Sequence, residues 1–574
     1  MRISNYVILC FAVGLIIGVG LFSTKISSPK AIPARNLPSF PQAGVIPPPR
    51  LWNNTWGGAG VDAATSVWGD GASVYTAGFT NSFGVGGPDF ALVAWDEATG
   101  TRQWNTTWGG VNVDEANSVW GDGTRIYTAG YTASYGAGSN DFALVAWDPA
   151  THARLWNTTW GGVYDDEANS VWGDGTRIYT AGLTNSFGAG GYDFALVAWD
   201  PATHAVLWNT TWGGASDDAA TSVWGDGARI YTAGYTFSYG AGGNDFALVA
   251  WDPATGARLW ATTWGGAAND VATSVWGDGA RIYTAGYTAS YGNGLNDFAL
   301  VAWDSATHAR LWNTTWGGAA DDIANSVWSN GGRIYTAGTT FNFGAMSVDT
   351  ALVVWDAATG NFLWSTMWGG AGDDRAYSVW GDGAHIFSAG YTTSFGAGSY
   401  DFAFVAWDIH FSVSHSSDVI YTAGTTGHAI NWTISCAITR TSNFTIYRDG
   451  INYANGAWMS DQNLSFPIDN LTAGSYIFTL VAGDGFGGQV QDIVNVAVLV
   501  AQNTPPSITW SALEWMTAGM LVLLGVIFVT MLLRRQTNNA IDGGRSTRTP
   551  DSKVEAPAEF PEEVSPKNTK KGPR

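Results

Sequence analysis

The sequence predicts an all-β protein, namely a seven-bladed β-propeller followed by an immunoglobulin-like β-sandwich, with a single C-terminal transmembrane helix. Three observations lead to this prediction. A unit of 52 residues repeats seven times, each unit holds four short runs of β-branched and aromatic residues, and an uncharged run of 19 residues lies near the C-terminus. Four antiparallel strands repeated at a spacing of about 40–50 residues are typical of a propeller.

The repeat is marked by the triplet Trp-Gly-Gly, which recurs every 52 residues without insertion or deletion. It begins at Trp56, Trp108, Trp160, Trp212, Trp264, Trp316 and Trp368. The repeat accounts for 28 of the 32 tryptophans. One blade cannot bury both of its faces, but seven blades packed around an axis can. We therefore expect a propeller over residues 51–410.

Each unit predicts four strands separated by turns. In the second unit they are 118–121, 125–132, 141–148 and 154–160. Gly121-Asp122-Gly123 supplies the positive-φ residues of a tight hairpin. We expect the tryptophan-rich strand at the outer edge, with Leu51–Trp56 completing the blade of Asp401–Asp408 and closing the ring. A linear β-solenoid is the alternative.

Three of the four histidines of the repeat region fall on one turn position, where they alternate with glycine. The residues at this position are Gly100, His152, His204, Gly256, His308 and Gly360. A left-handed backbone tolerates this exchange. We therefore predict turn residues here, and neither metal ligands nor catalytic groups.

The repeat pattern also carries a family resemblance. Trp-x-x-x-Trp-Gly-Gly-x-x-x-Asp-x-Ala-x-Ser-Val, Asp-Gly-x-x-Ile-Tyr-Thr-Ala-Gly and Asp-Phe-Ala-Leu-Val-Ala-Trp-Asp follow one another over 51–408. This pattern resembles the SBBP repeat, a propeller repeat of prokaryotic surface and secreted proteins. The resemblance implies a fold and a surface location and no defined chemistry.

A second resemblance concerns Ala94 to Trp104, which is similar to the AxDxxTGxxxW docking motif of quinoprotein propellers. In that family the tryptophan packs between blades. The chain lacks the adjacent cysteine pair of a pyrroloquinoline quinone pocket, and such enzymes have eight blades. The motif therefore supports the propeller and no cofactor.

The composition limits the possible partners. Only 13% of the residues are charged and the net charge is −21. Residues 51–533 hold 12 arginines, no lysine and 41 acidic residues, which argues against nucleic acid. Cys10 and Cys436 are the two cysteines, so no disulfide framework or cysteine-based metal site is expected.

Both ends of the chain predict membrane signals. Residues 1–24 are typical of a signal peptide or signal anchor, and 25–50 form a proline-rich spacer. The uncharged run Trp515 to Leu533 is long enough to span a bilayer as a transmembrane helix, and Arg534 and Arg535 follow it. The positive-inside rule places the tail 534–574, which we expect to be disordered, in the cytoplasm. The propeller is then extracellular at the cell membrane.

Residues 411–503 predict the immunoglobulin-like sandwich, and 504–514 a juxtamembrane linker. Leu471 to Tyr476 resembles the tyrosine corner of immunoglobulin-like and fibronectin-type domains. Without a paired cysteine, Cys436 is expected to be a small core residue.

Two aspartates recur at fixed positions in every blade. They are Asp62, Asp114, Asp166, Asp218, Asp270, Asp322 and Asp374, and Asp89, Asp141, Asp193, Asp245, Asp297, Asp349 and Asp401. Rings of carboxylates are able to bind Ca²⁺. Identical placement in all blades favours aspartates that cap turns by accepting backbone N–H bonds. We therefore predict no metal site.

The loop between the second and third strands varies most, yet keeps one aromatic residue. These residues are Phe83, Tyr135, Phe187, Tyr239, Tyr291, Phe343 and Phe395. If the loops converge around the axis, they offer stacking platforms for a sugar. A hydrophobic plug beneath each loop is the alternative.

Glycosylation sequons also follow the repeat. They are Asn53, Asn105, Asn157, Asn209 and Asn313 on the predicted outer strands, and Asn431, Asn443, Asn463 and Asn470 in the sandwich. Glycans at the first five would shield exposed blade edges.

Catalytic motifs are absent from the sequence, which contains no GxSxG elbow, HExxH or phosphate loop. We therefore predict a non-enzymatic, membrane-anchored adhesion or recognition protein of the cell surface that binds proteins or glycans without a cofactor. The alternative is an extracellular propeller enzyme, glycosidase-like or a quinoprotein dehydrogenase.

Overall fold

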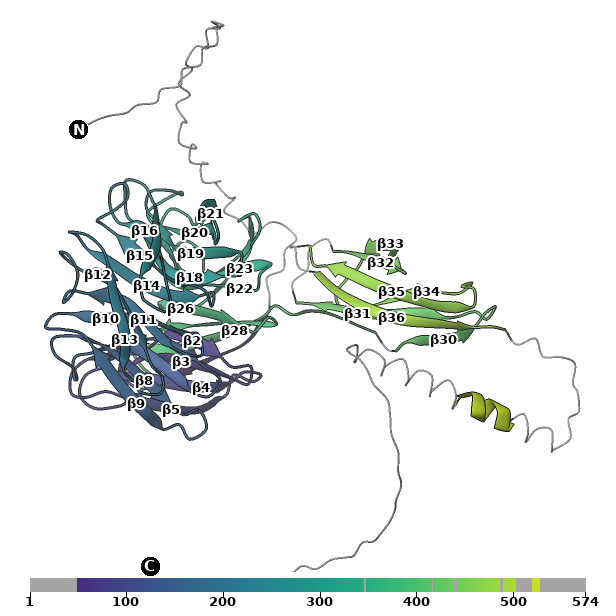
Figure 1. Ribbon diagram of the computed structural model, residues 1–574, viewed down its shortest axis with the longest axis horizontal. Coiled ribbons are helices and arrows are strands. Elements are labelled where there is room, and N and C mark those ends of the chain that lie inside the picture. Colours follow the sequence, from purple (N-terminus) through teal and green to yellow (C-terminus); the bar gives the residue numbers. More distant parts are fainter. Residues whose placement is uncertain are drawn as a thin grey trace, which may run out of the picture. The chain divides into compact units, whose positions relative to one another are not determined.

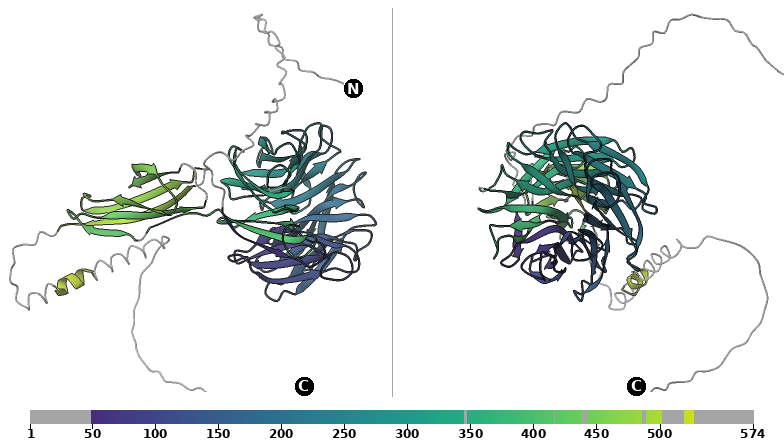
Figure 2. Two further views of the ribbon diagram at one scale, coloured as in Figure 1. Left: turned by 180° about the vertical axis from the view of Figure 1, so that it is seen from behind. Right: turned by 90° about the vertical axis from the view of Figure 1, so that its left-hand side faces the viewer.

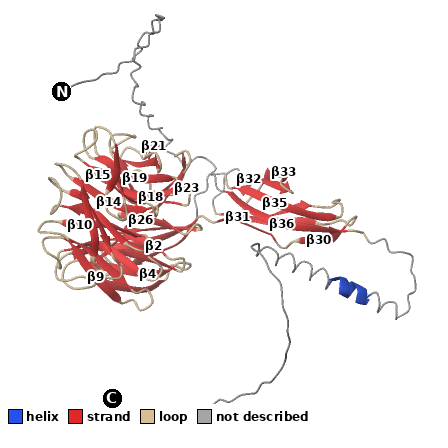
Figure 3. Cartoon of the chain, in the orientation of Figure 1, coloured by secondary structure: helices blue, strands red, loops and turns tan. Residues whose placement is uncertain are grey.

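The computed structural model describes residues 49–344, 347–415, 417–437, 442–485, 489–501 and 519–526 (Figure 1). Nearly all of the regular structure in these ranges is β-strand (Figure 3). Residues 49–410 form one set of sheets and residues 411–499 another, and each set is described by itself below.

The first set consists of seven antiparallel sheets of four strands each. Six of them follow the chain as blades 1 to 6. Blade 1 is β2 (Asp62–Gly69), β3 (Ser73–Thr80), β4 (Asp89–Asp96) and β5 (Arg102–Trp108). Blade 2 is β6 (Asp114–Gly121), β7 (Ile126–Thr132), β8 (Asp141–Trp147) and β9 (Arg154–Trp160). Blade 3 is β10 (Asp166–Gly173), β11 (Ile178–Thr184), β12 (Asp193–Trp199) and β13 (Val206–Trp212). Blade 4 is β14 (Asp218–Gly225), β15 (Ile230–Thr236), β16 (Asp245–Trp251) and β17 (Arg258–Trp264). Blade 5 is β18 (Asp270–Gly277), β19 (Arg281–Thr288), β20 (Asp297–Asp304) and β21 (Arg310–Trp316). Blade 6 is β22 (Asp322–Ser329), β23 (Arg333–Thr340), β24 (Asp349–Asp356) and β25 (Phe362–Trp368).

Blade 7 closes the ring by joining the two ends of the repeat region. Its first three strands are β26 (Asp374–Gly381), β27 (His385–Thr392) and β28 (Asp401–Asp408), and its fourth is β1 (Arg50–Trp56). Strand β1 pairs antiparallel with β28, with Trp56 opposite Phe402 and Trp52 opposite Ala406. The predicted interlock of first and last segments is confirmed, and the predicted propeller fold with it.

The seven blades fan around a common centre (Figure 2, right). The first strand of each blade is innermost, and it contacts the first strands of the two neighbouring blades. The third strand is buried throughout, as in β8, whereas the fourth strand is half exposed, as in β9. The tryptophan-rich strand therefore lies at the outer edge, as predicted.

Hydrogen bonds between innermost strands tie neighbouring blades together. In most blades a serine hydroxyl accepts the N–H of a valine in the next blade, as Ser66 does from Val119 at 3.1 Å. The residue before that serine donates to a carbonyl of the same neighbour, as Thr65 does to Ala116 at 2.8 Å. Polar side chains that would be costly to bury alone are thus satisfied between blades.

The turn position predicted to be left-handed has that conformation. His152, His204 and His308 have φ of 63°, 64° and 64°, and the glycines at this position have φ near 70°. His152 stacks on Trp104 of the preceding blade at 4.6 Å between ring centroids. The tryptophan of the docking motif therefore packs between blades, and the histidines are turn residues, as predicted.

Residues 411–499 form two sheets that share one core. The smaller sheet has the order β29 (Phe411–His415), β31 (Ala429–Cys436), β34 (Gln462–Pro467). The larger has the order β30 (Val419–Thr422), β36 (Gln489–Leu499), β35 (Gly474–Gly483), β32 (Asn443–Arg448), β33 (Ile451–Ala457). Cys436 is buried in their common core. At the predicted tyrosine corner, the Tyr476 hydroxyl donates to the Thr472 carbonyl at 2.9 Å.

Membrane signals are described only in part. Within the predicted span, residues 519–526 are helical, and the rest of 515–533 lies outside the described residues. No helix among the described residues is both long and apolar enough to cross a membrane. Segments 1–24 and 534–574, and most of 25–50 and 504–514, also lie outside the described residues.

Candidate binding site at the tryptophan-ringed centre of the propeller

Six of the seven innermost strands end in a Trp-Gly pair, and these pairs interlock with their neighbours around the ring. The indole of Trp68 lies against Gly121 of the next blade, where an added Cβ would fall 2.5 Å from the ring. Trp120 covers Gly173 in the same way. Only glycine leaves room for this packing, so the sequence Ser-Val-Trp-Gly builds a ring of indoles that the neighbouring backbones hold in place.

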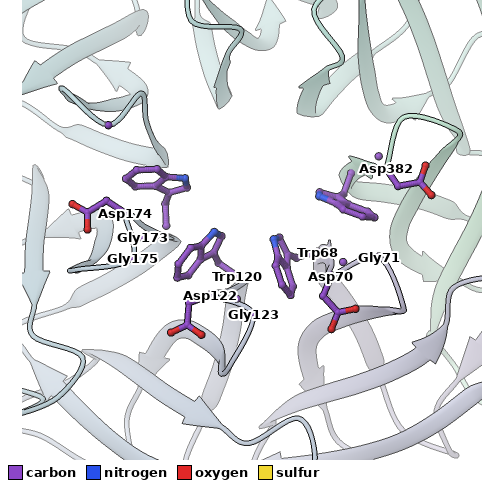
Figure 4. A pocket seen from close by; sticks show the side chains of 16 residues that line it. Trp68, Asp70, Gly71, Trp120, Asp122, Gly123, Gly173, Asp174, Gly175 and Asp382 are labelled. Atoms are coloured by element: carbon purple, nitrogen blue, oxygen red, sulfur yellow. The ribbon is translucent and has the colours of Figure 1, made fainter. Parts of the chain in front are cut away.

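These indoles surround a cavity of about 830 Å³. Its walls come from blades 1 to 4 and blade 7, and every lining residue is a tryptophan, a glycine or an aspartate. Figure 4 shows the indole edges of Trp68 and Trp120 turned toward the cavity. A large aromatic wall without any basic side chain suits a ligand that carries a positive charge.

The lining aspartates are held by their own hairpin turns. The carboxylate of Asp122 accepts the N–H groups of Thr124 and Arg125 at 2.8 and 2.7 Å, and the hydroxyl of Tyr127 at 2.9 Å. Burial raises the pKa of Asp122, but these hydrogen bonds outweigh it and bring the pKa below its usual value. The carboxylate is therefore ionised at neutral pH, behind the indoles (Figure 4).

The ring is not uniform, because blade 6 has Ser329 and Asn330 in place of Gly-Asp. The Ser329 hydroxyl donates to the Arg333 carbonyl at 2.8 Å, and Ser329 has a side chain at the position where the other blades have a glycine against the neighbouring indole. Trp276 of blade 5 instead contacts Trp224, with 6.0 Å between ring centroids. Blades 5 and 6 accordingly contribute no lining residue to the cavity described above.

A second feature adjoins the cavity at the junction of blades 7 and 1. Glu97, Asp382 and His385 bring oxygen and nitrogen atoms within 4.8 Å of one another, and Asp382 also lines the cavity. Burial raises the pKa of Glu97 to about 7, and a hydrogen bond with Asp382 and its charge add to this effect. Among the described residues this is the group whose types and spacing suit a metal ion.

The aromatic loop residues predicted as stacking platforms lie elsewhere. Each packs on the last tryptophan of the outer strand in the preceding blade, as Phe83 does on Trp56 at 5.1 Å and Tyr135 on Trp108 at 5.3 Å. The Tyr135 hydroxyl also donates to the Gly109 carbonyl at 3.0 Å. Five of these rings are about half exposed, Tyr291 and Phe343 are more buried, and none of the seven lines the cavity. Ligand binding by them stays a prediction, and the observed packing fits the plug interpretation.

The repeated aspartates cap loops between blades. Asp62 accepts the Gly58 N–H at 2.8 Å and the Ser82 hydroxyl at 2.6 Å, and Asp89 accepts the Val85 N–H at 2.6 Å. Burial raises the pKa of Asp89. This geometry matches the capping role predicted from the sequence.

The sequons of the repeat lie on outer strands, as predicted. The Asn105, Asn157 and Asn209 side chains are exposed there, and Asn53 and Asn313 are partly buried. The four sequon asparagines of the sandwich are also exposed. Glycosylation at these positions stays a prediction.

The sequence interpretation missed the tryptophan ring because it looked for function where the copies differ. The signal was the Trp-Gly pair at the end of six of the seven innermost strands, since a large side chain at the crowded centre needs a glycine opposite it. The cluster of Glu97 with Asp382 was missed because these residues are 285 positions apart.

Comparisons with known proteins find no family and only distant structural likenesses. No family model matches the chain, so the SBBP resemblance stays an expectation, and no curated protein matches it. Among solved structures, the Neurospora crassa Pan2 WD40 domain is 9% identical with a TM-score of 0.40, over 61% of this chain and 89% of that chain. The β-propeller domain of the Trilobed protease from Pyrococcus furiosus is 12% identical with a TM-score of 0.36, over 61% and 94%. The polysaccharide lyase Uly1 is 9% identical with a TM-score of 0.37, over 60% and 90%. Likenesses this distant carry no argument about function, and the chain's own strand pairing identifies it as a β-propeller of repeated four-strand blades.

Proposed function

We propose that this chain is a membrane-anchored binding protein of the cell surface, and that its propeller recognises a basic protein segment through the tryptophan-ringed cavity. The observation that carries the proposal is the lining of the cavity, which consists of tryptophan, glycine and aspartate alone. Lysine or arginine side chains that enter between neighbouring indoles reach the ring faces, where each gains about 0.5–2 kcal/mol.

Charge supports the same ligand class. Residues 51–533 have 41 acidic and 12 basic residues, with no lysine, so a cationic partner is attracted over long range. Near the cavity, Asp122 and Asp174 accept hydrogen bonds that hold the pKa of each carboxyl below its usual value. Membrane anchoring rests on the uncharged run Trp515 to Leu533 followed by two arginines, and the Tyr476 hydrogen bond supports an immunoglobulin-like stalk.

The enzymatic alternative has less support. Glycoside hydrolysis needs two carboxyl groups about 5–10 Å apart that face the substrate. The cavity-lining carboxylates of Asp70 and Asp122 instead cap their own turns and accept tyrosine hydroxyls. A non-enzymatic role without a cofactor is therefore the better proposal for the cavity.

The test is a titration of the full-length protein in detergent with a peptide of four arginines, followed by tryptophan fluorescence and calorimetry. The same peptide with neutral citrulline in place of arginine is the matched ligand control. We expect saturable binding of the arginine peptide that weakens with salt, and none of the citrulline peptide.

Two variants locate the binding. Trp120→Ala removes part of the cavity wall and is expected to lower the affinity for the arginine peptide by about tenfold. Trp104→Ala removes a tryptophan of the outer strand, away from the cavity, and is expected to leave the affinity unchanged. Salt-independent binding of neutral oligosaccharides at the cavity, with no affinity for the arginine peptide, would contradict the proposal in favour of a glycan.

A further inference from the structure

The junction between blades 7 and 1 differs chemically from the other junctions. At two other junctions, an arginine just before the second strand reaches a backbone carbonyl in the next blade's turn between its third and fourth strands. Arg125 donates to the Pro201 carbonyl at 3.1 Å, and Arg229 to the Ser305 carbonyl at 2.9 Å. The contact joins a cation to a neutral carbonyl, and it uses no side chain of the receiving turn.

Both sides of this contact are replaced at the junction of blades 7 and 1. The arginine position, which holds arginine in blades 2 to 6, is His385 in blade 7. The receiving turn position is Glu97 in blade 1, where the other blades have Pro149, Pro201, Pro253, Ser305, Ala357 and Ile409. One junction thus exchanges a guanidinium and a carbonyl for an imidazole and a carboxylate.

Asp382 lies between the two replacements. Its Oδ1 accepts the N–H groups of Ala384 and His385 at 2.7 and 2.6 Å, which fixes the carboxylate in its turn. Its Oδ2 lies 2.8 Å from His385 Nδ1. The Oε2 atom of Glu97 is buried and has no hydrogen-bond partner among the described residues. Two carboxylates and an imidazole therefore face one another, and one buried oxygen is unsatisfied.

We infer that Glu97, Asp382 and His385 bind a divalent transition-metal cation, Zn²⁺ in the first instance, which joins blade 7 to blade 1. Carboxylate oxygen and imidazole nitrogen bind Zn²⁺ at about 2.0–2.2 Å, so ligand atoms around one ion lie roughly 3–3.5 Å apart. The observed atoms lie within 4.8 Å of one another, so binding of the ion requires them to draw closer together. Water takes the fourth position, since His385 and Asp382 are partly exposed.

The location gives the ion a structural consequence. In blades 1 to 6 the residue before the conserved serine donates to the next blade, as Thr65 and Asn117 do. Blade 7 has Tyr377 at this position, and its ring packs on Tyr391 instead. The junction that closes the ring is thus the one where the repeat's threonine or asparagine is missing and the metal ligands are present. An ion that bridges blades 7 and 1 replaces the missing hydrogen bond between them.

The experiment measures Zn²⁺ binding by the full-length, tag-free protein after chelator treatment, with calorimetry and thermal melting. We expect one equivalent of Zn²⁺ to bind and the melting temperature to rise. Co²⁺ in place of Zn²⁺ is expected to give the visible absorption of a four- or five-coordinate site. This readout uses the unaltered chain and does not depend on whether a variant folds.

Variants then assign the ligands. Glu97→Gln keeps the shape of the side chain, and His385→Arg restores the residue of the other blades. Each variant is expected to lower the affinity for Zn²⁺ by at least about tenfold. Asp122→Asn alters the equivalent turn of blade 2, which has no glutamate or histidine partner, and is expected to leave Zn²⁺ affinity unchanged. Absence of saturable binding up to about 1 mM Zn²⁺, or binding that both ligand variants leave intact, would overturn the inference and leave a shared proton between Glu97 and Asp382.

Discussion

The Val67 N–H donates to the Ser378 hydroxyl at 3.1 Å and joins residues 311 positions apart in the sequence. This bond crosses from blade 1 to blade 7, where the ring closes. The same bond recurs between other neighbouring blades, so this part of the closing contact repeats one found around the ring.

Removing this contact tests how the ring is closed. Ser378→Ala leaves the buried Val67 amide without a partner, which costs about 1–3 kcal/mol in the free energy of unfolding. Ser66→Ala removes the same bond between blades 1 and 2, where Thr65 still bridges the blades. We therefore expect Ser378→Ala to lower stability more than Ser66→Ala, as measured by urea denaturation. Equal losses would show that the closing junction is no weaker than the others.

The interlocked Trp-Gly pairs predict a second difference, here between two glycine positions. Gly121→Ala places a Cβ about 2.5 Å from the Trp68 ring, so the indole must move and we expect a loss of about 1–3 kcal/mol. Gly279→Ala, in the equivalent turn of blade 5 away from the cavity, meets no atom within 4 Å and carries only the strain of φ 90°. Gly121→Ala is thus expected to lower the affinity for the arginine peptide, whereas Gly279→Ala changes stability alone. Peptide affinity and melting temperature of both variants separate the two effects.

The left-handed turn predicts how His152 responds to substitution. His152→Val is expected to destabilise by about 1–2 kcal/mol, because a β-branched residue at φ 63° is strained and the stacking on Trp104 is lost. In His152→Gly the relief of strain offsets the lost stacking, and stability stays within about 0.5 kcal/mol of the original. A valine variant as stable as the glycine variant would argue against the assigned backbone conformation.

The buried aspartates between blades give the protein a pH dependence. Burial raises the pKa of Asp297 to about 6, above the unfolded value of 3.8. The folded state therefore holds a proton more tightly than the unfolded state, and this contribution to stability is full below pH 3.8 and is lost as the pH rises through about 6. Asp297→Asn is expected to reduce the change with pH of the urea denaturation midpoint between pH 4 and 6.

Asp148 provides a matched variant, because its contribution to stability changes with pH in the opposite direction to that of Asp297. Hydrogen bonds from the N–H groups of Ala150 and Thr151 lower the pKa of Asp148, so its contribution is present above the unfolded pKa and lost as the pH falls. Asp148→Asn should therefore change the acid limb of the curve and leave the region near pH 6 unaltered. A flat curve for the original protein from pH 4 to 6 would contradict the assignment of Asp297.

The fold could be predicted from the sequence because the same four-stranded unit, with the same two faces to bury, recurs seven times. A 52-residue unit with four strands has two faces to bury, and equal neighbours around an axis bury them, so the pairing of Trp56 with Phe402 followed from counting. The first strand of each blade was harder to place, since β6 begins at Asp114, four residues before the predicted start at Ser118. The additional residues bond to the neighbouring blade, and a contact between units leaves no local pattern within one unit.

The site was less accessible from the sequence. Trp68 and Trp120 resemble other tryptophans of the repeat, and only the turn of their strands toward the axis gives them a common cavity. Phe83 satisfies a local rule for a surface aromatic, yet it packs on Trp56 of the preceding blade. The exchange of arginine for His385 was visible as a departure from the repeat, but its meaning depends on Glu97 from the other end of the ring.

The most direct test of the proposed binding role is an experimental density map of the full-length protein with the arginine peptide bound. The account predicts guanidinium groups stacked on the indoles of Trp68 and Trp120 within the cavity lined by blades 1 to 4 and 7. Peptide density on the outer aromatic residues such as Phe83, with the cavity free of peptide, would contradict it.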